Sequence, residues 1–218
     1  MCRGAPMPDV LSSLYPTTLL RRHLPDMAET NRQLAGIIAE LAATGPNMTA
    51  GTSTMGGFQT REDFLSEGHR YSQHPALVTL KHQLIAAIQD YAKLLFEQEC
   101  MRNPANVDFM LWGWGVSLKA GHSQDLHVHP TAHISGVYYV SAPPGALGET
   151  STAGKIRFYD PRPRANMNQL FTQITRVSET PSPGDILIFP SWLEHSVAPF
   201  EGEGERTCIA FNVRLNMS

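Results

Sequence analysis

Residues 125–140 read DLHVHPTAHISGVYYV and combine two patterns. The second half is a run of β-branched and aromatic residues that is typical of a buried strand. The first half places His127 and His129 two positions apart. Because side chains two apart in a strand point to the same face, both imidazoles would project together, with Asp125 on that face as well. Two imidazoles so placed can bind one metal ion when a third ligand comes from elsewhere in the chain.

Short strand-like runs, separated by Gly and Pro, fill the chain from about residue 108 onward. Each run is rich in β-branched and aromatic residues, which favour a pleated, half-buried backbone. Seven or eight such strands with turn signals between them predict a β-sandwich or barrel. The expected strands are 109–118, 133–140, 154–160, 171–177, 184–190, 195–200 and 206–215.

The N-terminal part has a different pattern, which predicts helices. Apolar residues recur at helical spacing over residues 27–42 and form a longer stripe over residues 76–98. Between them, residues 51–60 (GTSTMGGFQT) are rich in Gly and Thr and predict a loop. The stripes are typical of helices that pack against a core, so we expect the helices to buttress the β part.

Length and composition narrow the class of protein. A chain of 218 residues fits one domain, residues 1–218, with a helical buttress over about 1–105 and a β part over about 106–216. The net charge of −3 argues against nucleic acid as the main partner. No apolar run is long enough to span a membrane, and the amino terminus lacks the apolar segment of a secretion signal. Three widely spaced cysteines indicate reduced thiols, so we expect a cytoplasmic protein.

His195 is the candidate for the third metal ligand, and Arg206 follows it after eleven residues. If residues 195–200 and 206–211 pair as a hairpin, the two side chains lie near its open end. An Arg beside a metal cannot ligate it but can clamp a carboxylate through a bidentate pair. This arrangement predicts a small anionic co-substrate that chelates the metal at one end and is bound by Arg206 at the other.

The histidine pair, the distal histidine and the arginine together resemble the double-stranded β-helix (a jelly-roll, cupin-like core) of Fe(II)/2-oxoglutarate-dependent oxygenases. More narrowly, the chain resembles a bacterial and phage-associated family of 2-oxoglutarate/Fe(II) (2OG-Fe(II)) oxygenases defined by sequence more than by a known reaction. The shared blocks run from about residue 11 to 214 and include HVHPTAHISGVYYV (127–140) and FPSWLEHSV (189–197). The resemblance implies a mainly β core with N-terminal helices, a ferrous ion, 2-oxoglutarate as co-substrate and O2.

Carried over residue by residue, the resemblance makes His127 and His195 iron ligands and Arg206 the anchor of the distal 2-oxoglutarate carboxylate. The general pattern of the superfamily is HxD/E…H, so the remaining ligand is open. Either His129 replaces the carboxylate, which we favour because its spacing fits, or Asp125 supplies it. Cys208 stands where a serine often follows the anchoring arginine, which is a departure from the pattern.

Four further residues are weaker candidates. Tyr138 and Tyr139 lie on opposite faces of one predicted strand, so one of them can face the co-substrate, and the sequence does not decide which. Asn212 lies on the strand of the anchoring arginine and could reach the same ligand. Trp192, three residues before His195, is a candidate for the pocket wall.

The resemblance implies hydroxylation of a small-molecule or peptide substrate, with release of succinate and CO2. Two other functions fit the same residues. One is a cupin-type enzyme that holds a metal with three histidines and does not use 2-oxoglutarate. The other is a non-catalytic β-barrel that binds a small molecule and carries its histidines incidentally.

Overall fold

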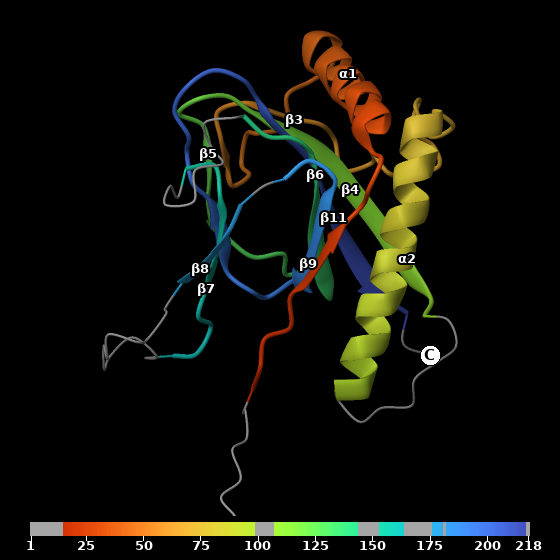
Figure 1. Ribbon diagram of the computed structural model, residues 1–218, viewed down its shortest axis with the longest axis vertical. Helices are drawn as coiled ribbons and strands as arrows, with labels where there is room; N and C mark the ends of the chain where they lie inside the picture. The colour runs from red at the N-terminus through yellow and green to blue at the C-terminus, as the bar shows by residue number, and fades with distance from the viewer. Residues whose placement is uncertain (1–14, 99–106, 144–152, 164–175, 181, 217–218) are drawn as a thin grey trace, which may run out of the picture.

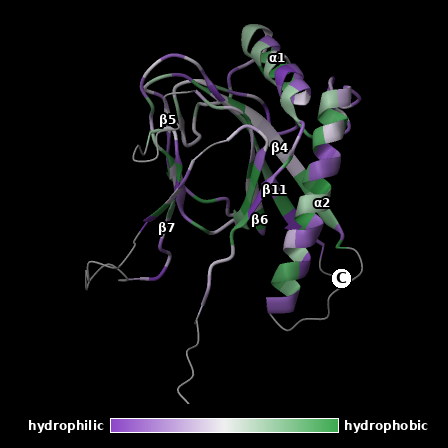
Figure 2. Ribbon diagram, viewed as in Figure 1, coloured by the Kyte–Doolittle hydropathy of each residue, from purple (hydrophilic) through white to green (hydrophobic). Residues whose placement is uncertain are grey.

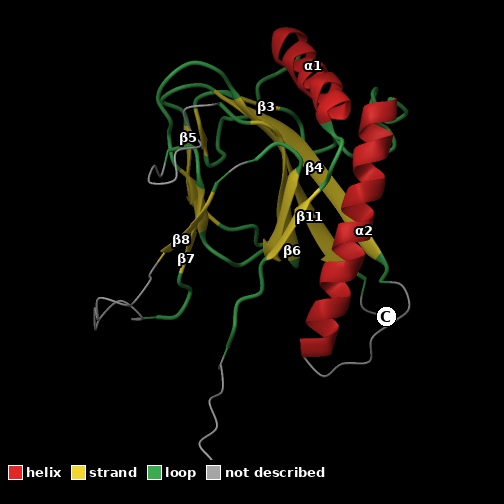
Figure 3. Ribbon diagram, viewed as in Figure 1, coloured by secondary structure: helices red, strands yellow, loops and turns green. Residues whose placement is uncertain are grey.

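The computed structural model describes residues 15–98, 107–143, 153–163, 176–180 and 182–216. Two antiparallel sheets pack face to face, and two helices cover the outer face of one of them (Figures 1 and 3). The expected mainly β fold with N-terminal helices is confirmed. The elements in chain order are β1 (Leu20–His23), α1 (Ala28–Thr44), β2 (Thr54–Met55), β3 (Phe58–Gln59), α2 (Pro75–Gln98), β4 (Phe109–Leu118), β5 (Ser123–His127), β6 (Ile134–Ser141), β7 (Ile156–Tyr159), β8 (Arg176–Glu179), β9 (Asp185–Pro190), β10 (His195–Val197) and β11 (Arg206–Leu215).

The strands divide into a major and a minor sheet. The major sheet has the order β1-β9-β6-β11-β4-β3, and the minor sheet has the order β2-β5-β10-β7-β8. All neighbouring strands are antiparallel. Consecutive strands such as β9, β10 and β11 alternate between the sheets, which is the jelly-roll connectivity.

Two hydrophobic cores hold these layers together. In the outer core, the apolar stripe of α2, including Leu80 and Leu84, packs with α1 and the major sheet (Figure 2). The inner core lies between the two sheets. Because side chains alternate along β6, Tyr138 enters the outer core and Tyr139 the inner core. Each fully buried large apolar side chain contributes about 1.5–3 kcal/mol, so these cores fix the layers that position the inner face. None of the described helices is long and apolar enough to cross a bilayer.

Residues 51–60 are not entirely loop, because they contain β2 and β3. Gly56 and Gly57 have φ angles of 78° and 71°, which other residues rarely adopt, and they turn the chain between the two short strands. Strand β2 pairs with β5 and β3 pairs with β4, so the segment adds one strand to each sheet. These strands are not evident from the Gly/Thr-rich sequence, because they are stabilised by backbone pairing with β5 and β4 and not by a side-chain pattern of their own.

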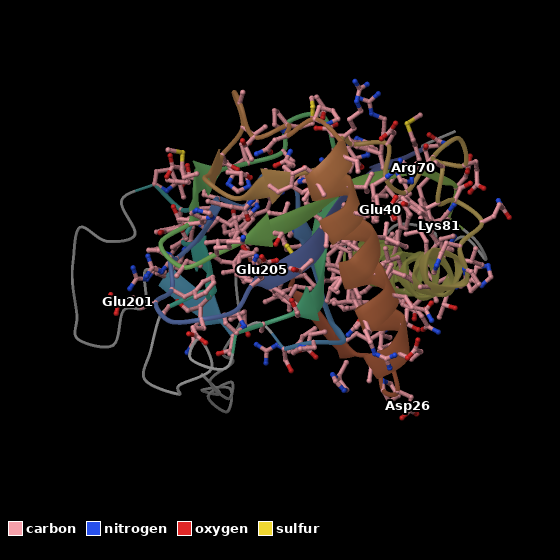
Figure 4. All side chains as sticks on the ribbon, turned by 90° about the horizontal axis from the view of Figure 1, so that it is seen from above. Asp26, Glu40, Arg70, Lys81, Glu201 and Glu205 are labelled. Carbon is pink, nitrogen blue, oxygen red and sulfur yellow. The ribbon has the colours of Figure 1, made fainter. Side chains whose placement is uncertain are left out.

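Strand β1 was not expected from its sequence either. Its residues, LRRH, include two arginines, and it pairs with β9 at the edge of the major sheet. Charged side chains are common on edge strands, where they discourage pairing with another chain. Glu40 of α1 forms an ion pair with Arg70, and both residues are labelled in Figure 4.

The hairpin considered for residues 195–200 and 206–211 does not form. Strand β10 pairs with β5 and β7 in the minor sheet, whereas β11 pairs with β4 and β6 in the major sheet. Phe200 is buried in the inner core, and the turn between the labelled Glu201 and Glu205 crosses from one sheet to the other (Figure 4). Consequently His195 and Arg206 face the interior from opposite sheets.

Candidate functional site

Three histidines gather between the sheets at one end of the minor sheet. His127 ends β5, His129 lies in the turn that follows, and His195 begins β10 directly opposite His127. One ring nitrogen from each lies within 4.8 Å of the others. The Nε2 atoms of His129 and His195 are 3.3 Å apart, which suits two ligands bound to one ion through bonds of about 2.1 Å.

Two of the imidazoles have their Nδ1 atoms on backbone carbonyls. His127 Nδ1 lies 2.7 Å from the Asp125 carbonyl oxygen, and His195 Nδ1 lies 2.8 Å from the Leu193 carbonyl oxygen. A carbonyl oxygen only accepts, so each Nδ1 carries the proton and each Nε2 keeps a lone pair for a metal. The donor set therefore fits a divalent ion such as Fe(II).

Asp125 does not join the cluster. Between β5 and β10 the register shifts, so that His127 and Gln124 pair with His195 and Val197. Three residue steps on β5 thus match two on β10, which is a β-bulge. The strict alternation that would put Asp125 beside His127 is broken, and the Asp125 side chain is exposed.

Aromatic side chains surround the histidines. The ring centroid of Phe189 lies 4.8 Å from that of His195, and the centroid of Trp114 lies 5.8 Å from that of His129. Burial lowers the pKa of His129 to about 4 and that of His195 to about 3, and it also lowers the pKa of His127. The imidazoles are therefore neutral near pH 7, which is the form that ligates a metal.

Protonation of these imidazoles should destabilise the metal-free chain in mild acid. In the folded chain the pKa values of His129 and His195 are about 4 and about 3, against 6.5 for an unperturbed imidazole. Between these values the unfolded chain binds more protons, so the free energy of unfolding falls as the pH drops from about 6.5 toward about 4. One pKa unit corresponds to about 1.4 kcal/mol, so we expect a loss on the order of a few kcal/mol. Urea denaturation at a series of pH values measures it. The loss should be smaller in His129→Gln. An equal loss in this variant would show that protonation of His129 does not cause the destabilisation.

Arg206 and Tyr139 form a second polar group on the inner face of the major sheet. Arg206 is 1% exposed, and its guanidinium carbon lies 5.1 Å from the centroid of the Tyr139 ring. Its Nε donates to the Gly154 carbonyl oxygen at 3.2 Å, and Nη1 lies 3.4 Å from Cys208 Sγ. No Asp or Glu among the described residues forms an ion pair with it.

The Tyr139 hydroxyl is buried and has no hydrogen-bond partner in the part of the chain that the structure describes. Burial raises its pKa to about 12, so it stays protonated and can donate. A buried cation without an anion beside a buried donor without an acceptor is energetically unfavourable by itself. A carboxylate satisfies both groups, so this pair fits one end of 2-oxoglutarate.

The inner face of β11 connects the two polar groups. Its inward residues are Arg206, Cys208, Ala210 and Asn212, and Asn212 contacts His129. Cys208, beside the guanidinium, is about 13 Å along the strand from Asn212. Ala210 between them is partly exposed while its neighbours are buried, so the strand is accessible at this level. The inner face of β11 therefore joins the histidine cluster at Asn212 to the guanidinium of Arg206.

The structure separates the remaining candidates. Tyr138 faces the helices, where its hydroxyl donates to Asn31 Oδ1, so Tyr139 is the tyrosine that faces the site. Trp192 lies in the turn between β9 and β10 and is 53% exposed, so it is not part of a buried wall. Ser135 forms a hydrogen bond with Asn212 but is not among the candidates that the sequence suggests. Its signal is a small polar residue at an inward position of an otherwise apolar strand.

Comparison with known proteins supports the class of protein that the sequence resembles. Residues 113–212 match a protein-family model described as "Putative 2OG-Fe(II) oxygenase". The matched segment contains the three histidines, Tyr139 and Arg206, and the match confirms the resemblance seen in the sequence. No curated protein sequence matches the chain.

Solved structures of 2-oxoglutarate-dependent oxygenases share the fold. A prolyl-4-hydroxylase from Pseudomonas putida is 17% identical, with a TM-score of 0.57 over 92% of this chain and 94% of that one. HygX from Streptomyces hygroscopicus, with nickel and 2-oxoglutarate bound, is 14% identical, with a TM-score of 0.56 over 91% and 83%. SnoN, an α-ketoglutarate-dependent epimerase from nogalamycin biosynthesis, is 14% identical, with a TM-score of 0.57 over 91% and 78%.

Proposed function

We propose that this chain is an Fe(II)- and 2-oxoglutarate-dependent oxygenase that hydroxylates a C–H bond of a small-molecule or peptide substrate. The overall reaction converts substrate, 2-oxoglutarate and O2 into hydroxylated substrate, succinate and CO2. The observation that carries the proposal is the arrangement of three neutral imidazoles on one inner face opposite Arg206 and Tyr139 on the facing sheet, where the buried guanidinium forms no ion pair with a described Asp or Glu. A two-ended site of this kind suits a ligand that chelates a metal and presents a distal carboxylate.

In this proposal His127, His129 and His195 hold Fe(II), and the bound iron with its co-substrate supplies the oxidative chemistry. Arg206 binds the distal carboxylate through charge-assisted hydrogen bonds, and Tyr139 donates a further one. Phe158 and Phe189 pack beside His195 and keep bulk water away from its ring. The role of the protein is thus to bind, orient and exclude water.

Titration with 2-oxoglutarate tests the proposal. The chain is loaded with Fe(II) without oxygen, and 2-oxoglutarate is added while the metal-to-ligand absorption band is followed. Admission of O2 should then release succinate in proportion to the co-substrate consumed, and faster when the true substrate is present. A metal-loaded chain that shows no band and no succinate would instead be a metal enzyme of the cupin type, and a chain without stoichiometric metal would be a binding barrel.

The neighbouring tyrosines provide a matched pair of variants. Tyr139→Phe removes the hydroxyl that we place on the co-substrate, so the Kd for 2-oxoglutarate should rise about 10-fold or more, because a hydrogen bond to a charged group contributes about 1.5–3 kcal/mol. The stability of the metal-free chain should not fall, since no described residue forms a hydrogen bond with this hydroxyl. Tyr138→Phe should lower the stability and leave the Kd for 2-oxoglutarate unchanged, because it removes the hydrogen bond to Asn31 and does not alter the co-substrate site.

Isothermal titration of the Fe(II)-loaded or Co(II)-loaded chain gives the Kd, and thermal unfolding of the metal-free chain gives the stability. Equal effects of the two substitutions on both quantities would remove Tyr139 from the site. A Kd that rises only in Tyr138→Phe would contradict the assigned orientation of β6.

A further inference from the structure

The third histidine of the cluster differs from the other two in its surroundings. His127 and His195 each have a backbone carbonyl oxygen at Nδ1, which fixes the proton there. His129 has the Asn212 side chain instead, with Nδ2 of the amide 3.4 Å from Nδ1 of the imidazole. The tautomer of His129 is therefore set by a side chain that can either donate or accept.

Asn212 is itself held in place by Ser135. The Ser135 hydroxyl donates to Asn212 Oδ1 at 2.7 Å, and the two residues lie directly opposite each other on β6 and β11. Asn212 is 4% exposed and Ser135 is 1% exposed. Both strands are central in the major sheet, so the amide has a fixed position and one remaining freedom, rotation about its own axis.

We infer that Asn212, supported by Ser135, is a positioning residue that selects the metal-binding tautomer of His129. To ligate through Nε2, His129 must carry its proton on Nδ1 and needs an acceptor for it. A half-turn of the Asn212 amide presents Oδ1 to His129 and Nδ2 to Ser135. The Ser135 oxygen can accept that hydrogen bond as readily as its hydroxyl donates in the opposite orientation.

The hydrogen-bonded relay Ser135–Asn212–His129 thus has two orientations, in which the same three residues are paired but Oδ1 and Nδ2 of Asn212 exchange partners. In one, Nδ2 of Asn212 donates to His129 Nδ1, and Nε2 carries the imidazole proton and can donate to His195 Nε2 at 3.3 Å. In the other, Oδ1 accepts from His129 Nδ1, and both Nε2 atoms are free for a metal. The first orientation suits the metal-free chain and the second suits the metal-bound chain. This inference rests on the proposed metal site.

Metal titration of matched variants tests the relay. In Asn212→Ala, the Kd for Co(II), followed by its visible absorption, should rise about 10–100-fold, which is the usual effect of losing the hydrogen-bond partner of a ligating histidine. Asn212→Asp should restore the Kd to within a few-fold of wild type, because a carboxylate accepts from Nδ1 but cannot donate. Asn31→Ala is the control, since Asn31 is also a buried asparagine bonded to a strand side chain, but on the outer core.

The outcomes separate the relay from the metal site itself. Asn31→Ala should lower thermal stability and leave the Kd for Co(II) unchanged. If wild type binds Co(II) and Asn212→Ala binds it equally well, the inference is overturned. It is also overturned if Asn212→Asp binds as weakly as Asn212→Ala, which would mean that Asn212 matters only for packing. If wild type binds neither Co(II) nor Fe(II), the proposed function fails before the relay is reached.

Discussion

Arg206→Met should abolish tight binding of 2-oxoglutarate while leaving the metal-free chain at least as stable as wild type. Loss of one partner of a buried, hydrogen-bonded charge pair costs about 2–5 kcal/mol of binding free energy. At about 1.4 kcal/mol for each factor of ten, the Kd should rise at least about 30-fold and up to several thousand-fold. Succinate release at ordinary co-substrate concentrations should then be lost, whereas the Kd for the metal should stay within a few-fold.

The expected gain in stability follows from the unusual environment of this guanidinium. Arg206 is buried and forms no ion pair with the described acidic residues. Methionine has a similar length and no charge, and replacement of buried charges by apolar residues is often neutral or stabilising by about 1–4 kcal/mol. Loss of the hydrogen bond to Gly154 opposes this by about 1 kcal/mol.

Thermal unfolding and isothermal titration on the same preparation distinguish a binding role from a structural one. Arg22→Met is a suitable control, because Arg22 lies on the edge strand β1 and forms an ion pair with Asp90 of the outer helix α2. It should change neither the affinity for 2-oxoglutarate nor the affinity for the metal. A sharp loss of stability in Arg206→Met with unchanged co-substrate affinity would make Arg206 a structural residue and remove the carboxylate anchor.

Individual strands and helices could be predicted from the sequence because the residue pattern that forms each one lies within the element itself. Residues 109–118 and 206–215 were expected as strands and form β4 and β11 with the same bounds. The stripe over residues 76–98 forms α2 at nearly the same limits. The spacing of His127 and His129, with His195 beyond, predicted a cluster that the fold brings within 4.8 Å. In each case the side chains themselves carry the periodicity.

What could not be predicted depends on contacts between distant segments. Residues 195–200 and 206–211 do not pair as a hairpin, because Phe200 is buried in the inner core and the chain crosses there to the other sheet. Asp125 was expected beside His127, but a bulge that is set by the partner strand β10 leaves it exposed. The choice between Tyr138 and Tyr139 likewise needed the helices, which cover one face of β6 and leave the other toward the site.

Substitution of the histidines in the cluster should cause a large loss of metal affinity. In His127→Ala and His195→Ala, the Kd for Fe(II) or Co(II) should rise more than about 100-fold, since even the outer partners of metal ligands account for 10–100-fold. The fold should persist, because removal of a buried imidazole leaves both cores in place. Metal content after dialysis, visible absorption of the Co(II) form and circular dichroism together measure these effects.

Variants at the third position decide between the two candidate ligands. Asp125→Asn should leave metal affinity unchanged, because the Asp125 side chain is exposed and only its backbone carbonyl meets His127. His129→Ala should lose the metal as His195→Ala does. His129→Asp should retain it, because two histidines and one carboxylate form the facial triad of many Fe(II) oxygenases. A large loss in Asp125→Asn, with none in His129→Ala, would transfer the third ligand to Asp125 and require the β5 bulge to rearrange when the metal binds.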